Sequence, residues 1–248
     1  MWQWIHKAAS PKITYRWAEI CQSWLALLSL ICFSYGAIGA LLLSPIDYQQ
    51  GNVYRIMYLH VPSAIWSLGV YMIMAIAVVI YFVWKIKVAD VVAQTSAPIG
   101  ASFALLTLIT GSIWGKPTWG TFWIWDARLT SELILLFIYI GIIAIRSAIP
   151  DRNLAARASG VVTLMGVVNI PIVHYSVNWW NTLHQGATLL KLGAPSIAPS
   201  MLHPLLAMIS AFFFYYFWLL MAKVRTELLI RESHTQWVKS ILCKEEQH

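Results

Sequence analysis

The segment 114–130 reads WGKPTWGTFWIWDARLT and places five aromatic side chains within twelve residues. Its tryptophans are Trp114, Trp119, Trp123 and Trp125, with Phe122 among them. If the segment is helical, Trp119, Phe122, Trp123 and Asp126 recur at helical spacing and share one face. Such a face is flat and aromatic with a polar end, and would suit a large planar conjugated ligand. The alternative is an aromatic belt at a membrane surface, where Trp and Tyr often collect.

Polar residues follow the aromatic group directly. Asp126 and Arg128 come first, and Thr130 or Ser131 can then cap the helix that we expect next. Two roles are open for Asp126, which can pair with Arg128 or orient a tryptophan indole N–H. The residue types alone do not choose between them.

Four of the seven histidines flank or lie near this segment, namely His60, His174, His184 and His203. Neutral imidazole is the commonest protein ligand for metals, and haem iron is often held axially by histidine. The alternative for His60 and His203 is a polar residue near a helix start, since Pro62 and Pro204 suit a first turn. His174 can instead hydrogen-bond inside a helix bundle. Trp180 and His184 are four residues apart, so a short helix would place them on one face.

The rest of the chain must position these groups at a membrane. Of 248 residues, 59% are apolar and 11% are charged, with a mean hydropathy of +0.66, which excludes an ordinary soluble globular domain. Apolar runs of about 20 residues without period-2 alternation predict membrane-spanning helices. We expect an all-α polytopic membrane protein, a single six-helix domain over 1–248 with aromatic-rich outer-face loops. The predicted spans are about 24–43, 62–84, 97–113, 131–149, 158–177 and 201–222, with a kink at Pro171.

The basic residues predict the orientation of these spans. The termini and the loops after spans two and four hold thirteen Lys and Arg, whereas the other side holds Arg55, Lys116, Arg128 and Lys191. The positive-inside rule therefore places both termini in the cytoplasm and the tryptophan-rich outer loop 114–130 on the opposite face. The net charge of +7 is spread over short loops, so nucleic acid is a poor explanation for it.

Residues 119–130 closely resemble the tryptophan-rich signature of the WWD family of haem-handling membrane proteins, roughly WGxxWxWDxRLT. Phe122 stands where many members carry a further Trp, and this exchange retains an aromatic surface. Together with LHVPS around His60 and TLHQ around His184, the resemblance covers essentially the whole chain. The short length and one histidine on each side of the tryptophan-rich loop resemble the haem exporter protein C (CcmC) family of the cytochrome c maturation pathway.

The resemblance implies a site for haem b, bound without a covalent link. His60 and His184 would ligate the iron from opposite faces, and Trp119 and Trp123, with Trp114 and Trp125, would form a platform against the porphyrin. Arg128 and Arg55 would bind the propionates, because an Arg fork matches a carboxylate. Asp126 would belong to the same site.

The resemblance also implies a place and a role. The protein would lie in the bacterial inner membrane, hold haem at the periplasmic face and deliver it to the membrane-anchored haem chaperone CcmE. A small membrane protein, CcmD, would stabilise this complex, and the ABC transporter CcmA/CcmB would use ATP to release loaded chaperone. The chain has no GxxxxGK[ST] loop, so we expect no enzyme here and ATP hydrolysis by partners only. The alternatives are a haem transporter across the membrane, a haem or quinone anchor of a respiratory complex, and a scaffold.

Overall fold

The computed structural model describes residues 9–184, 186 and 197–245, and helices are the only regular secondary structure among them. The first element is α2 (Pro11–Ile38), which continues into a π-helical turn, η1 (Gly39–Leu43). A 3-10 turn, η2 (Val53–Ile56), leads into α3 (Met57–Trp84). The remaining helices are α4 (Lys87–Trp119), α5 (Ala127–Ala148), α6 (Arg152–Gly166), α7 (Asn169–Trp179), α8 (Pro199–Arg231) and α9 (Gln236–Glu245).

Six helical segments are long and apolar enough to cross a membrane, which confirms the all-α polytopic fold. The helices extend beyond the predicted spans, since α2 begins at Pro11, α4 at Lys87 and α8 at Pro199. Hydropathy marks only the part that crosses hydrocarbon, whereas a helix continues into the headgroup region for as long as its backbone bonds are satisfied. For the same reason Pro62 and Pro204 lie inside helices rather than at their starts.

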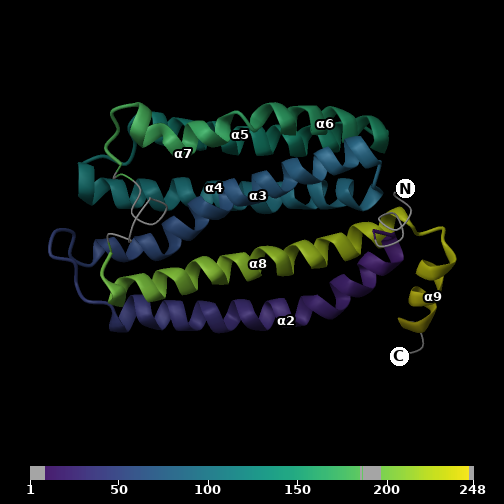
Figure 1. Ribbon diagram of the computed structural model, residues 1–248, viewed down its shortest axis with the longest axis horizontal. Helices are drawn as coiled ribbons and strands as arrows, with labels where there is room; N and C mark the ends of the chain where they lie inside the picture. Colours follow the sequence, from purple (N-terminus) through teal and green to yellow (C-terminus); the bar gives the residue numbers. More distant parts are fainter. Residues whose placement is uncertain (1–8, 185, 187–196, 246–248) are drawn as a thin grey trace.

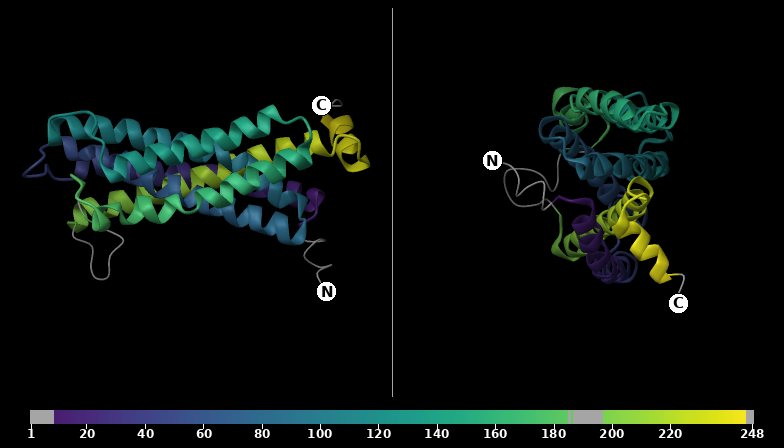
Figure 2. Two further views of the ribbon diagram at one scale, coloured as in Figure 1. Left: turned by 90° about the horizontal axis from the view of Figure 1, so that it is seen from above. Right: turned by 90° about the vertical axis from the view of Figure 1, so that its right-hand side faces the viewer.

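The spans form a bundle of three layers (Figure 1). Helix α2 packs along α8, α3 packs against α4 in the middle, and α5 lies with α6 and α7 on the far side. The end-on view in Figure 2 shows the same order. Helix α2 begins and α8 ends at one end of the bundle, and the tryptophan-rich segment lies at the opposite end. Lys191, which belongs to the predicted outer charges, falls outside the described residues.

The predicted fifth span is broken where its proline requires it. Helix α6 ends at Gly166 and α7 begins at Asn169, five and two residues before Pro171. Proline lacks an N–H and its ring clashes with the carbonyl four residues earlier, here that of Val167. The backbone turns tighter at this point, and Val167 N–H donates to Leu164 O at 3.3 Å. The break redirects α7 along α5 toward the tryptophan-rich end.

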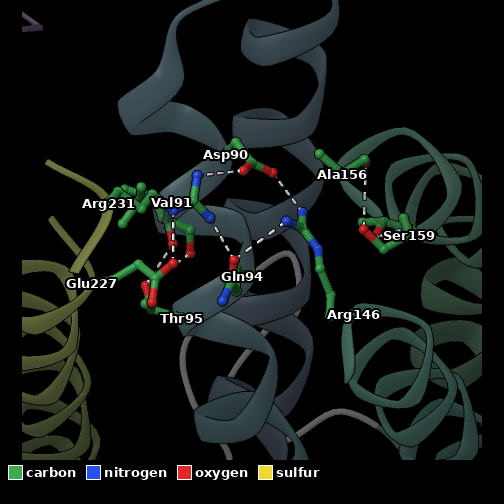
Figure 3. A network of polar contacts seen from close by, with 11 residues as sticks. Asp90, Val91, Gln94, Thr95, Arg146, Ala156, Ser159, Glu227 and Arg231 are labelled. Carbon is green, nitrogen blue, oxygen red and sulfur yellow. Dashed lines mark hydrogen bonds and ion pairs between the residues drawn. The ribbon is translucent and has the colours of Figure 1, made fainter. Parts of the chain in front are cut away.

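At the end away from the tryptophan-rich segment, one carboxylate joins three helices (Figure 3). Asp90 of α4 accepts from Arg146 of α5 at 2.6 Å and from Arg231 of α8 at 2.8 Å. Both arginines also donate to Gln94, and Arg231 donates to Glu227 at 2.7 Å. We call these five residues the Asp90 network. Its contacts hold α5 and α8 against α4. In a membrane such polar contacts matter for helix association, because apolar side chains gain little by leaving lipid to pack against each other.

Candidate functional site

The segment 114–130 is a helix end, a loop and a helix start. Helix α4 ends at Trp119 because Gly120 adopts the left-handed backbone conformation, with φ of 81°, and its N–H donates to Lys116 O. The prediction that Trp119, Phe122, Trp123 and Asp126 share one helical face is therefore wrong. The loop nevertheless brings two of them, Trp119 and Asp126, to the same histidine.

Asp126 caps α5. Its Oδ1 accepts a hydrogen bond from Leu129 N–H at 2.8 Å, as an N-cap carboxylate does. The alternative caps, Thr130 and Ser131, are wrong, because α5 already begins at Ala127. Ser131 lies within the helix, and its hydroxyl donates back to Ala127 O at 2.6 Å.

The other oxygen of the same carboxylate holds His184. Asp126 Oδ2 lies 3.2 Å from His184 Nδ1, and the side chains are 8% and 18% exposed. Neither role that the sequence left open for Asp126 is the one observed, because its partners are a backbone amide and an imidazole. Trp119 meets the same ring edge to face, with centroids 4.8 Å apart. Trp180 and His184 do not share a helix, because α7 ends at Trp179.

The environment of His184 favours a neutral ring with a defined tautomer. Burial lowers its pKa, and Asp126 opposes that shift only in part. Because a carboxylate accepts, Nδ1 carries the proton and Nε2 keeps a free lone pair. An imidazole whose Nδ1–H is held by a carboxylate, with Nε2 left for iron, is a recurring arrangement in metal sites.

Helix α4 holds the imidazole of His60 through its Nδ1, as Asp126 holds that of His184. His60 lies in the first turns of α3, with Nδ1 3.1 Å from both Thr107 O and Thr110 Oγ1. The Thr110 hydroxyl donates to Leu106 O, and a carbonyl can only accept, so Nδ1–H is the donor and Nε2 is again free. A Cβ at Gly111 would lie 3.0 Å from the imidazole, so any larger residue here would press against the ring. Trp114 packs edge-on against the ring at 5.7 Å.

The two imidazoles lie at the same end of the bundle. They interact electrostatically with each other, and both also interact with Arg128. We call His60, His184, Trp114, Trp119 and Asp126 the histidine–tryptophan cluster. Its members come from α3, the end of α4, the cap of α5 and the segment after α7, so the bundle gathers them from far apart in the sequence.

Arg128 differs from the other arginines that are partly buried. These are Arg55, Arg146, Arg225 and Arg231, and each donates side-chain hydrogen bonds. The guanidinium of Arg128 has no hydrogen-bond or ion-pair partner within the described residues, although Asp126 and Glu132 interact with it electrostatically. A partly buried cation without a partner is costly unless a ligand supplies the anion.

Arg55 is already engaged elsewhere. Its guanidinium donates to Ala40 O, to Ser44 O at 3.0 Å and to Asn52 Oδ1 at 3.2 Å. These contacts tie η2 to the carbonyl groups at the end of the first span, which a helix terminus leaves without partners. The predicted contact between Arg55 and an anionic ligand stays a prediction.

The remaining tryptophans differ in exposure and in their polar contacts. Trp114 Nε1–H donates to Gln50 Oε1 at 2.8 Å. Trp123 is partly buried, its indole N–H has no partner within the described residues, and its ring meets Trp125 at 5.4 Å. Trp125 is 76% exposed. Three of the four tryptophans, Trp114, Trp119 and Trp123, are therefore partly buried, and Trp125 faces outward.

Several residues of the site were missed by sequence reasoning. Thr107, Thr110 and Gly111 line His60, and with Trp114 they recur at i, i+3, i+4 and i+7, a helical stripe that could have identified them. Gln50 and the buried Glu132 carried no such signal. His174 packs against Tyr175 at 4.7 Å, and His203 is exposed.

Among residues 9–184, 186 and 197–245, no group of three or more His, Cys, Asp or Glu side chains could hold a metal ion. Haem brings four porphyrin nitrogens of its own, so the residues that could contribute to holding it are the two imidazoles, the neighbouring indoles and the Arg128 guanidinium.

Known proteins match this sequence over nearly the whole chain. The family model described as "Heme exporter protein C" matches residues 4–239. "Heme exporter protein C" of Haemophilus influenzae is 51% identical, over 97% of this chain and 98% of that protein. The Escherichia coli (strain K12) protein of the same name is 48% identical over 98% of both. A Marchantia polymorpha relative, "Putative cytochrome c biosynthesis ccmC-like mitochondrial protein", is 48% identical over 69% of this chain. The chain is thus a multi-pass membrane protein that belongs to the heme exporter protein C (CcmC) family, which handles haem in cytochrome c biogenesis.

Proposed function

We propose that this protein binds haem b at the periplasmic face of a bacterial inner membrane and delivers it to the haem chaperone CcmE for c-type cytochrome biogenesis. The observation that carries the proposal is the pair of imidazoles. His60 and His184 both have Nδ1 held and Nε2 free, and both lie against tryptophans at one end of the bundle.

In this proposal haem is the cargo, and the chain's own groups determine how it is held. Each Nε2 donates its lone pair to iron, while Asp126 and Thr107 fix the ring orientations. Trp114, Trp119 and Trp123 remove porphyrin surface from water, at roughly 25 cal/mol per Å². Arg128 is the free cation available for a propionate.

Three features support delivery rather than permanent storage. Trp125 and Phe122 are 76% and 57% exposed beside the site, so a partner can reach it. Arg128 is the one arginine beside the cluster, among the described residues, whose guanidinium has no hydrogen-bond or ion-pair partner, so the ligand would be held but not enclosed. The charge asymmetry of the loops supports a periplasmic position with both termini in the cytoplasm. CcmD and the transporter CcmA/CcmB complete the proposed assembly, and any ATP hydrolysis belongs to them.

The first experiment titrates ferric haem into the purified protein in detergent and records absorption spectra. Low-spin bands of bis-imidazole iron, saturating at one haem per chain, are the expected result. A protein that stays colourless, or one that binds haem with high-spin bands only, would contradict the proposed site.

The second experiment tests delivery and separates it from transport, the alternative function. Sealed vesicles containing the protein and membrane-anchored chaperone receive haem on the periplasmic face only, and covalent loading of the chaperone is measured. We expect loading without haem entering the lumen, and none with a chaperone that lacks its haem-capturing histidine. Loading that requires haem on the cytoplasmic face would favour a transporter instead.

A further inference from the structure

We propose that Glu132 shortens the residence of haem by competing with a haem propionate for Arg128. The inference rests on the proposed function and adds a residue that tunes release. It concerns two ionisable side chains of α5 that lie one helical turn apart, the partly buried Arg128 and the buried Glu132.

Glu132 is a carboxyl group in an unusual place. It is 5% exposed, and its Oε1 is buried without a hydrogen-bond partner within the described residues. Ser67 of α3 lies near enough to interact with it. Buried polar atoms nearly always have partners, so an orphaned carboxylate oxygen next to a ligand site calls for an explanation.

The nearest explanation is the equally unpaired Arg128. The two side chains interact electrostatically, yet they form no ion pair within 4.0 Å. Asp126 cannot replace Glu132 in this role, because its two oxygens are already used by Leu129 N–H and His184 Nδ1. Glu132 is therefore the one nearby carboxylate, among the described residues, with an oxygen still available to the guanidinium.

The arrangement gives Arg128 two possible anions. With haem bound, the guanidinium contacts a propionate and leaves Glu132 unpaired. When haem leaves, attraction to Glu132 lowers the free energy of the emptied site, because opposite charges interact strongly where water is scarce. The competition weakens haem binding without touching the iron, the porphyrin or their other ligands, which suits a protein that must pass its cargo on.

The test is the rate at which bound haem is lost to an excess of apomyoglobin, followed by absorption. Glu132→Gln keeps the size of the side chain but removes its charge, so haem should leave about three- to tenfold more slowly. Glu132→Asp, whose carboxylate is withdrawn by one methylene, should give an intermediate rate. Glu19→Gln is the matched control, since it removes the same charge from an ion pair with Arg225 at the far end, and should leave the rate unchanged.

The decisive comparison is made in a protein that already carries Arg128→Ala. If Glu132 acts through Arg128, adding Glu132→Gln to Arg128→Ala should change the rate less than twofold. An equal slowing in that background, or an unchanged or faster rate for Glu132→Gln alone, would overturn the inference. If Glu132→Gln does not fold, as judged by thermal unfolding, Glu132→Asp decides by the same criteria. A wild-type protein that binds no haem would instead refute the proposed function itself.

Discussion

The two ends of the bundle treat charged side chains in opposite ways. In the Asp90 network, one carboxylate accepts from two arginines, and Gln94 and Glu227 occupy further donors. At the other end Arg128, Glu132 Oε1 and the Trp123 indole N–H have no hydrogen-bond partners within the described residues. Apart from Arg146 Nε, the first set of groups is paired by the protein itself, whereas the second set has no partner within the part of the chain that the structure describes.

The contrast separates structure from ligand binding. A charge buried in a membrane protein is stable only when it is paired, so the Asp90 network is explained by the fold that it fixes. Leaving polar groups unpaired at the other end lowers stability, which natural sequences accept mainly at functional sites. The pairing state of the buried charges therefore distinguishes the two regions.

The largest expected effect is on stability and lies in the Asp90 network. Asp90→Ala leaves Arg146 and Arg231 without their shared carboxylate and should lower the free energy of unfolding by about 3–5 kcal/mol. Thermal unfolding in detergent measures this loss. Asp151→Ala is the control, because it removes an exposed N-cap acceptor from α6, worth about 1 kcal/mol.

Protein that survives the Asp90→Ala substitution should still bind haem with wild-type spectra, because the network is far from the site. Loss of haem binding with unchanged unfolding would reverse the roles that we assign to the two ends.

The next effect concerns the free guanidinium. Arg128→Ala should weaken haem affinity about 10- to 100-fold, since a charge-assisted contact to a carboxylate contributes roughly 1.5–3 kcal/mol. Stability should change much less than in Asp90→Ala, because Arg128 loses only its attraction to Asp126 and Glu132 and no hydrogen bond or ion pair within the described residues. Titration of haem and of haem dimethyl ester, which lacks free carboxylates, checks the cause. The variant and the wild type should bind the ester equally, and a persisting difference would assign Arg128 another role.

Asp126→Asn separates the two roles of this carboxylate, which caps α5 and holds His184. Asn caps helices as well as Asp does, so Leu129 N–H keeps an acceptor and thermal stability should hardly change. His184 loses the carboxylate that holds its Nδ1–H, and haem affinity should fall about tenfold. Asp151→Asn at the start of α6 is the matched cap variant. Equal haem affinity in Asp126→Asn and wild type would mean that the carboxylate does not position His184.

The smallest expected effect is at His60. Thr110→Val removes one of the two oxygens near Nδ1 but leaves Thr107 O in place. Haem affinity should therefore fall only about two- to fivefold, the range of one neutral hydrogen bond. Ser102→Ala, another α4 hydroxyl that bonds its own helix, should have no effect on haem titration. A larger loss than in Asp126→Asn would show that His60 depends on its oxygen neighbours more than His184 does.

The sequence predicted the parts of the fold that hydropathy controls. Six apolar runs gave six spans, and Pro171 marked the break between α6 and α7. Helix ends were predicted less well, because local signals compete there. Thr130 and Ser131 are good capping residues, yet Gly120 ends α4 early enough for Asp126 to take the cap.

The sequence suggested candidate site residues from their types, but it did not predict which of them contact one another. Nothing in the spacing of Asp126 and His184, 58 residues apart, indicates that they meet. The same holds for Trp114 and Gln50, which are joined by a hydrogen bond between α4 and the loop before η2. The pairing of Arg55 and the isolation of Arg128 depend on where other helices end, so two arginines that looked alike in sequence have different surroundings.

The most direct test of the account is the absorption spectrum of haem-loaded wild type beside His60→Ala and His184→Ala, purified in parallel. We predict low-spin bis-imidazole bands in the wild type. Each single variant should keep its thermal stability but show a high-spin spectrum that added imidazole returns to low spin. Low-spin bands that survive both substitutions, without added imidazole, would place the iron elsewhere and contradict the account.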